Sequence, residues 1–162
     1  MVYSLSKNEV YGEPALADSK TETMPLASLY SIVQLLERAA QSGAGLTFYL
    51  LGSSREAKIS YSQLLEDSRV RATHIKALPA AATSEVMLIH FETHRESITW
   101  FWAALIAGFT PAISPPFVHD EARRKKHLRH VQTLLKDPLV LTSQKLIPDF
   151  LDLQLNSSRL RR

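Results

Sequence analysis

Histidine supplies the most versatile chemistry in this chain, because its imidazole ring titrates near neutral pH and binds metal ions. His90 and His94, two of six histidines, are four residues apart, but they span a predicted strand-to-helix junction, where that spacing does not align side chains. His127 and His130 share one face of a predicted helix, yet neither a carboxylate nor a third ligand stands at a matching offset. We therefore expect solvated or capping histidines and assign no metal-binding residue.

The run from Asp120 to His130 holds the one basic cluster of a chain whose net charge is +3. On one interpretation, its basic side chains contact nucleic-acid phosphates. No aromatic residue lies among them to stack on bases, however. The same segment carries an apolar stripe, which consists of Ala122, Leu128, Val131, Leu134 and Leu135. We therefore expect a solvated helix face, with nucleic-acid binding as the weaker alternative.

Aromatic residues could line a pocket or fill a core, and the residues concerned are Tyr49, Tyr61, Trp100 and Trp102. Packing is the expected role, because aromatic side chains at strand and helix positions usually pack. The glycines near 43–45 and 52 are too sparse to cradle a phosphate, and no serine stands in a nucleophile-elbow context. The chain has no cysteine, which excludes thiolate catalysis and Cys-ligated zinc. We assign no catalytic and no cofactor-binding residue.

Composition indicates an ordinary globular domain. The chain has 162 residues, of which 45% are hydrophobic and 22% charged, enough apolar material to offset the entropy of ordering. The absence of cysteine suits a reducing compartment. Neither a secretory signal nor an apolar run near the roughly 20 residues of a membrane span is visible. We expect a cytoplasmic protein without a membrane span.

The elements that must position these residues follow a polar leader, which we expect at 1–25. Apolar residues recur at helical spacing from Ser28 until Gly43 ends the pattern. The β-rich runs 46–51 and 58–61 predict a hairpin. Capping boxes are expected for Ser60 with Gln63 and for Thr93 with Glu96.

Strands and helices alternate through the rest of the chain. The predicted order is a helix ended by Pro79, a strand at 86–91, a helix closed by Gly108, a strand at 111–114, a helix at 120–136, a strand at 139–142 and a helix from Ser143. This order predicts the α/β class, a mostly parallel sheet flanked by helices, with a short N-terminal hairpin. We expect the domain at 26–155 and a frayed basic tail at 156–162.

Several segments, in this order, resemble adenylate-forming (AMP-binding) enzymes, the superfamily of acyl-CoA ligases, acyl-AMP ligases and peptide-synthetase adenylation domains. Residues 59–64 resemble the first core motif, a Thr/Ser-Tyr-x-Glu-Leu element that opens a helix. Residues 103–111 resemble the second, a helix that ends in Ala-Gly before a strand leading to proline. Residues 91–104 and 115–142 are similar to fungal synthetase-like adenylating proteins of secondary metabolism. The resemblance covers about 28–155.

The resemblance implies a family that uses ATP and Mg²⁺ to convert a carboxylate into an acyl-adenylate, and then passes the acyl group to CoA or a phosphopantetheine thiol. The 162 residues contain no Ser/Thr/Gly-rich phosphate loop ending in Pro-Lys and no subdomain with the family's catalytic lysine, so no family active-site residue maps onto them. We therefore expect the truncated N-terminal part of such a ligase, inactive alone and without a cofactor of its own. Its implied partners are the remainder of an adenylation domain or a carrier protein.

A second hypothesis is a small non-catalytic α/β binding or regulatory module derived from the same fold. It predicts a monomer that unfolds cooperatively. The truncated-domain hypothesis instead predicts an exposed sheet edge and an exposed apolar face.

Overall fold

The computed structural model describes residues 30–49, 56–117, 120–151 and 160–161. The expected leader and most of the expected tail lie outside these residues. The helices are α1 (Ile32–Ala39), α2 (Tyr61–Lys76), α3 (His94–Ala107), α4 (Glu121–Leu134) and α5 (Ile147–Leu151), with 3₁₀ turns η2 (Pro79–Thr83) and η3 (Gln144–Leu146). The strands are β1 (Gly45–Tyr49), β2 (Glu56–Ser60), β3 (Val86–His90), β4 (Thr110–Ile113), β5 (Leu139–Thr142) and β6 (Leu160–Arg161).

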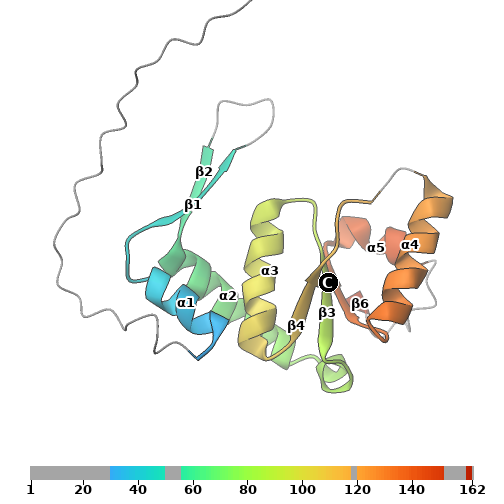
Figure 1. Cartoon of the computed structure of the whole chain (residues 1–162), viewed down its shortest axis with the longest axis horizontal. Helices are drawn as coiled ribbons and strands as arrows, with labels where there is room; N and C mark the ends of the chain where they lie inside the picture. The colour runs from blue at the N-terminus through green and yellow to red at the C-terminus, as the bar shows by residue number, and fades with distance from the viewer. Residues whose placement is uncertain (1–29, 50–55, 118–119, 152–159, 162) are drawn as a thin grey trace, which may run out of the picture.

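A parallel sheet with the strand order β4-β3-β5-β6 forms the centre of the structure, and β1 and β2 form a separate antiparallel pair. Met87 in β3 lies opposite Pro111 in β4 and Leu139 in β5. Figure 1 shows α3 between the sheet and the group formed by α1, α2 and the hairpin, whereas α4 and α5 lie beyond the sheet. The predicted α/β class, parallel sheet and hairpin are confirmed.

Side chains of β3 and β5 alternate between the two faces of the sheet, as the period of two in a strand requires. One face carries Met87, Ile89, Leu139 and Leu141, which form a buried cluster with Ile75 of α2 and Ala103 and Ala104 of α3. The other carries Leu88 and Val140, which pack against Leu128 of α4 and Phe150 of α5. By the same alternation, His90 and Thr142 at the ends of these strands lie on the α4 and α5 face.

Helix α3 is covered on two sides. Trp100 and Phe101 pack on the sheet cluster, whereas Trp102 joins a third cluster, which consists of Leu36, Ile59, Leu64 and Leu65 with surrounding partly buried side chains. The helix begins after Thr93, whose hydroxyl accepts a hydrogen bond from the Glu96 N–H, and ends at Gly108 with φ of +94°. Glycine adopts this left-handed conformation without strain.

Local chemistry moves two of the predicted boundaries. Helix α1 begins at Ile32 rather than Ser28, because Ser31 and Gln34 form a reciprocal capping box. The predicted helix that Pro79 ends stops at Lys76, and Pro79 instead opens the 3₁₀ turn η2, for which its fixed φ suits the first position.

Two further expectations need correction. Residues 160–161, placed in a frayed tail, form β6 and pair with β5 in parallel, so two tail residues supply ladder hydrogen bonds. On α4, Ala122 is exposed and Leu134 is 66% exposed, although both were assigned to the apolar stripe. Leu128, Val131 and Leu135 occupy the side that packs on the sheet, whereas Leu134 is turned about 100° from Leu135 around the helix axis.

Strand β3 lies inside the sheet, between β4 and β5, whereas β4 lies at an outer edge of the sheet. Ile113 on β4 is 55% exposed. Among the described residues, no strand pairs with the outer side of β4, which leaves that edge of the sheet open.

Candidate functional site

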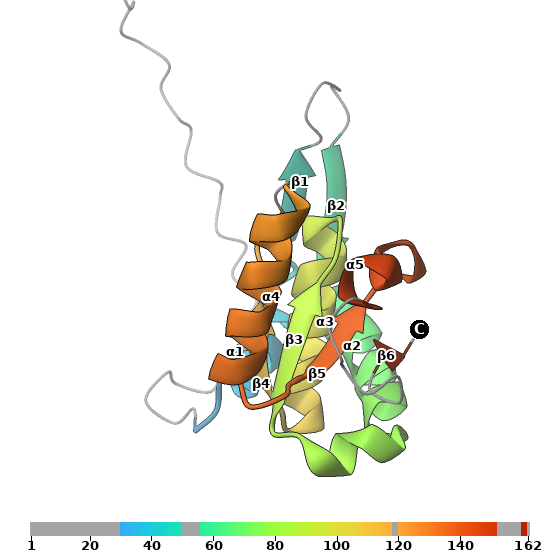
Figure 2. The same ribbon diagram turned by 90° about the vertical axis from the view of Figure 1, so that its right-hand side faces the viewer.

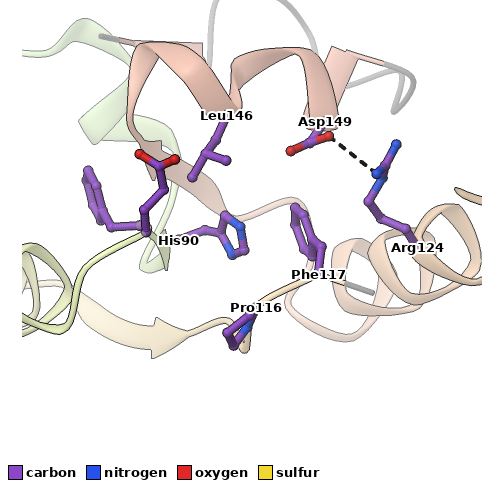
Figure 3. A pocket seen from close by; sticks show the side chains of 8 residues that line it. His90, Pro116, Phe117, Arg124, Leu146 and Asp149 are labelled. Atoms are coloured by element: carbon purple, nitrogen blue, oxygen red, sulfur yellow. Dashed lines mark ion pairs between the residues drawn. The ribbon is translucent and has the colours of Figure 1, made fainter. Parts of the chain in front are cut away.

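A cleft of about 270 Å³ opens at the carboxyl ends of the parallel strands, and we call it the His90 cleft. Its walls come from the segment after β3, the segment after β4, the first turn of α4 and the η3–α5 region (Figure 3). The lining residues are His90, Phe91, Glu92, Pro116, Phe117, Arg124, Leu146 and Asp149.

The topology of the sheet explains why a cleft forms there. The chain leaves β3 toward α3 on one face of the sheet, but it leaves the neighbouring β5 toward α5 on the opposite face. Adjacent strands whose connections diverge leave a gap at their carboxyl ends, where open α/β sheets commonly bind ligands. The His90 cleft lies at such a switch point.

His90 is the last residue of β3 and lines the cleft. Its ring is stacked on Phe117, with ring centroids 3.9 Å apart and an interplanar angle of 16°. Phe150 contacts the same ring edge-on at 5.4 Å. The side chain is only 4% exposed, and Nδ1 has no hydrogen-bond partner among the residues that the structure describes. His90 is thus neither solvated nor a cap, which corrects the sequence-based expectation.

The environment of His90 favours the neutral imidazole. Burial lowers the pKa of His90 below its ordinary value, because the apolar surroundings disfavour the charged ring, and the nearby Asp149 carboxylate raises it in part. The strand partner of His90 in β5 is Thr142, whose buried Oγ1 also lacks a partner, as does the buried Oγ of Ser143. Several buried polar atoms therefore gather near the carboxyl ends of β3 and β5 without partners among the described residues.

An ion pair joins α4 to α5 across one side of the cleft. Nη1 of Arg124 lies 3.4 Å from Oδ1 of Asp149, and the two side chains are 22% and 30% exposed (Figure 3). Nε of Arg124 is buried and has no hydrogen-bond partner in the described part of the chain. Glu92, an exposed residue just after β3, supplies a second carboxylate to the lining. The cleft thus combines two carboxylates, one guanidinium, one neutral histidine and apolar walls.

Three other histidines are not among the residues that line this cleft. His94, His127 and His130 are all exposed. Among the residues that the structure describes, no three His, Cys, Asp or Glu side chains lie close enough together to hold a metal ion.

The basic side chains of α4 lie partly in ion pairs and partly in solvent. Lys125 lies 2.6 Å from Glu121, and Arg123 lies 3.5 Å from Asp120. Lys126 and Arg129 are exposed. The arrangement fits the solvated helix face that the sequence predicts.

Packing is confirmed as the role of three of the four aromatic residues. Tyr61 and Trp102 pack in the third cluster, and Trp100 stacks on Phe91 at 5.9 Å. Tyr49 is different, since it is 78% exposed and lines a second cleft between the hairpin and the start of α3. It lies on the outward face of β1, which the alternating exposure of that strand leaves in solvent.

Sequence reasoning did not find the His90 cleft. Its residues come from positions 90–92, 116–117, 124, 146 and 149, and no local spacing relates them. A usable signal was present, however, because polar His90 and Thr142 end two otherwise apolar strands.

No helix in the described part of the chain has the length and apolar character to cross a membrane.

Comparison with known proteins relates the chain to large fungal synthetases. No protein-family model matches it. It is 46% identical over 132 residues to microperfuranone synthase of Emericella nidulans, a match that covers 78% of this chain and 14% of the relative. It is 36% identical to the nonribosomal peptide synthetase acyN of Ascocoryne sarcoides, covering 74% of this chain and 13% of the relative. The chain therefore spans only about a seventh of the length of these relatives.

Solved structures agree with these relatives. The adenylation domain of a keto acid-selecting nonribosomal peptide synthetase module, bound to a keto acyl adenylate, matches with a TM-score of 0.62 and 32% identity, over 78% of this chain and 23% of that chain. A fatty acyl-adenylate ligase from the study of E. coli and L. pneumophila enzymes shares the fold, with a TM-score of 0.67 and 22% identity over 83% of this chain and 24% of that chain. The chain is therefore a partial match, over most of its own length, to the adenylation domains of fungal nonribosomal peptide synthetases and related adenylate-forming enzymes.

Proposed function

We propose that this chain is the N-terminal portion of an adenylation domain in a fungal synthetase-like enzyme of secondary metabolism. The complete domain would use ATP and Mg²⁺ to convert a carboxylic acid into an acyl-adenylate, and CoA or a phosphopantetheine thiol would then accept the acyl group. The observation that carries the proposal is the 46% identity to microperfuranone synthase over 132 residues.

This N-terminal portion would act as a scaffold in the adenylation domain, and the rest of the domain would bind the nucleotide. Acyl adenylation needs the triphosphate charge clamped and the carboxylate aligned with the α-phosphate. The His90 cleft does not fit a triphosphate, because Glu92 and Asp149 place two carboxylates in a space of about 270 Å³. We therefore propose that the 162-residue polypeptide alone does not form acyl-adenylates, and that its function requires the remainder of an adenylation domain.

An exchange of segments tests the proposed scaffold role. Replacing the matching segment of microperfuranone synthase by this chain's residues should leave ATP–pyrophosphate exchange within about tenfold of the parent enzyme, a change in barrier of about 1.4 kcal/mol. A chimera that folds, as judged by its circular dichroism and melting, but has no exchange activity would contradict the proposal.

The polypeptide by itself provides the matching negative test. ATP–pyrophosphate exchange is measured for the 162-residue chain with keto, aryl and fatty acids, and no exchange above background is expected with any of them. Keto acids belong in the panel because the adenylation domain with 32% identity is described as keto acid-selecting. Robust exchange by the isolated chain would overturn the claim that it is inactive alone.

A non-catalytic α/β module is the alternative, and one observation favours it. The described residues form three buried clusters, which include fully buried side chains such as Met87, Ile89 and Phe150. The module predicts a monodisperse monomer with one cooperative melting transition, whereas a bare scaffold with an open edge at β4 should associate or melt broadly. Light scattering during thermal melting separates the two.

A further inference from the structure

We propose that the outer side of α4 and the pocket at its N-terminal end bind an acidic protein segment that carries one apolar side chain. We call this region the α4 surface, and it consists of that pocket and of the exposed residues Arg123, Lys126, His127, Arg129 and His130. The inference does not rest on the proposed role in adenylation, because that role makes no use of the outer side of α4.

Charge is the first argument for an acidic partner. Residues 122–136 contain six lysine and arginine residues and no aspartate or glutamate. Ion pairs with carboxylates outside this range engage three of the six, which are Arg123, Arg124 and Lys125. Lys126 and Arg129 are exposed and form no ion pair with a described residue. Unpaired charges of one sign on one helix attract a segment of the opposite sign.

Helical geometry places these charges on one side of α4. Arg123, Lys126 and His130 follow one another at intervals of three and four residues, so they share a line along the helix. Leu128, the buried residue of α4, packs against the sheet on the opposite side. Figure 1 shows α4 at one end of the structure, and in Figure 2, where that end faces the viewer, no other described element lies in front of it. The carboxylates of an extended segment can therefore reach this line.

A pocket of about 270 Å³ lies at the N-terminal end of the line. Its lining residues are Pro115, Pro116, Phe117, Arg123, Arg124 and His127. None of these described residues is acidic, which distinguishes the pocket from the neighbouring His90 cleft. The proline and phenylalanine rings and the arginine stems offer apolar surface beside the cationic groups. Because drug-binding pockets usually measure roughly 300–1,000 Å³, this smaller pocket suits a single side chain of the size of leucine.

The pocket favours a protein segment over a nucleic acid. A duplex presents phosphates and sugars on its outer surface, and single strands bind largely through aromatic stacking. Residues 120–136 contain no Phe, Tyr or Trp, and the His90 ring already covers one face of Phe117 at 3.9 Å. An acidic segment with one leucine supplies both the negative charge and the apolar group that the α4 surface fits.

The primary experiment measures peptide binding to the intact 162-residue chain by fluorescence anisotropy. The probe is a labelled, end-capped peptide with one leucine between two runs of three glutamates. Two matched peptides replace either the leucine by alanine or all glutamates by glutamine. We expect saturable binding of the probe, about tenfold weaker binding of the alanine peptide because it lacks the buried apolar group, and no saturable binding of the glutamine peptide.

Each other outcome of this experiment contradicts a stated part of the proposal. Absence of saturable binding by the probe, or equal binding of the probe and the glutamine peptide, would overturn it. Equal affinity of the leucine and alanine peptides would contradict the apolar side chain in the pocket.

NMR locates the bound probe. We expect nuclear Overhauser contacts between the leucine methyl groups of the probe and the ring of Phe117, together with a saturable shift of the His130 ring resonances. Contacts of the methyl groups only with Tyr49 or Ile113, which are exposed on β1 and β4, would place the probe elsewhere and contradict the proposal.

Charge reversal separates a local contact from an effect of net charge. Lys126→Glu should weaken the probe about fivefold, because a surface ion pair is replaced by a repulsion. Lys76→Glu makes the same change in net charge at an exposed position on α2 and should leave the affinity unchanged. Equal weakening by both variants would show a general charge effect and contradict binding at the α4 surface. Thermal melting of each variant confirms that it is folded.

A short DNA duplex tests the other class of acidic partner. No binding of the duplex is expected at the salt concentration at which the probe binds. Binding of the duplex that Lys126→Glu weakens would assign the surface to nucleic acid and overturn the proposal of a protein segment.

Discussion

Helices α3 and α4 have the same length, 14 residues, and each joins two parallel strands, yet they are built on different principles. Thr99, Ala103 and Ala104 are buried in α3, which lies between the sheet and the α1–α2 group (Figures 1 and 2). In α4 the one buried residue is Leu128, and the opposite side faces solvent. A helix enclosed on two sides needs small residues at its closest contacts, whereas a helix on the surface needs only one apolar stripe.

The difference places the candidate site on the α4 side of the sheet. Around α3 the described contacts are almost entirely apolar, and polar groups there would be buried without water. Around the start of α4, Arg124 pairs with Asp149, and Glu92 lines the same partly open cleft. The candidate site therefore lies beside the less buried helix, which contributes Arg124 to it, whereas the more buried helix packs between two apolar clusters.

The largest expected effect comes from placing a charge in α3. Ala104→Asp buries a carboxylate at a position that is 0% exposed, and should cost more than about 4 kcal/mol of unfolding free energy or prevent folding. The same substitution at exposed Ala122 in α4 should change it by less than about 0.5 kcal/mol. Urea denaturation of both variants tests the comparison. Similar effects of the two would contradict it.

A smaller effect is expected from the apolar stripe of α4. Leu128→Ala removes a buried side chain of the cluster between α4 and the sheet, and should cost about 3 kcal/mol. Leu134→Ala on the same helix is the matched control, and should cost less than about 0.5 kcal/mol because the side chain is 66% exposed. Equal losses in denaturation midpoint would show that Leu134 is packed in solution.

The pH dependence of stability tests the buried histidine. Because burial lowers the pKa of His90, the unfolded chain binds more protons than the folded chain below the ordinary histidine pKa. The contribution of neutral, buried His90 to the free energy of unfolding is therefore complete above about pH 6.5, the ordinary histidine pKa. It is lost as the pH falls below that value. Melting curves from pH 8 to pH 5 should show a shallower decline for His90→Gln than for the wild type.

Exposed His130 provides the control for that measurement. His130→Gln should leave the pH dependence as in the wild type. If the two histidine variants have the same pH profile, His90 is not the buried group that the structure describes.

The smallest effect is expected on the solvent side of α4. Lys126→Ala should alter the unfolding free energy by less than about 0.5 kcal/mol, because Lys126 is exposed. Binding of the wild type to a short DNA duplex, measured at low and moderate salt, should be absent. A salt-dependent affinity that Lys126→Ala weakens would instead favour the nucleic-acid alternative.

Most of the fold could be predicted because its signals are local. The strands β3 and β5, the cap at Thr93 and the left-handed Gly108 follow from patterns that extend over a few residues. The wrong predictions concern which side of a helix or strand is buried, because that depends on the element that packs against it. Leu134 and Tyr49 are apolar residues in regular elements, and only their orientation relative to the sheet and hairpin decides that they are exposed.

By itself, the sequence determined the order of strands and helices, their caps and the resemblance to adenylate-forming enzymes, because periodicity and motif spacing are properties of neighbouring residues. The tertiary structure alone decided that His90, Arg124 and Asp149 share one cleft. These residues belong to β3, α4 and α5, and the divergence of the chain after β3 and β5 brings them to one edge of the sheet. Parallel strands need long crossovers, so residues that meet at a carboxyl edge are far apart in the chain and leave no local pattern.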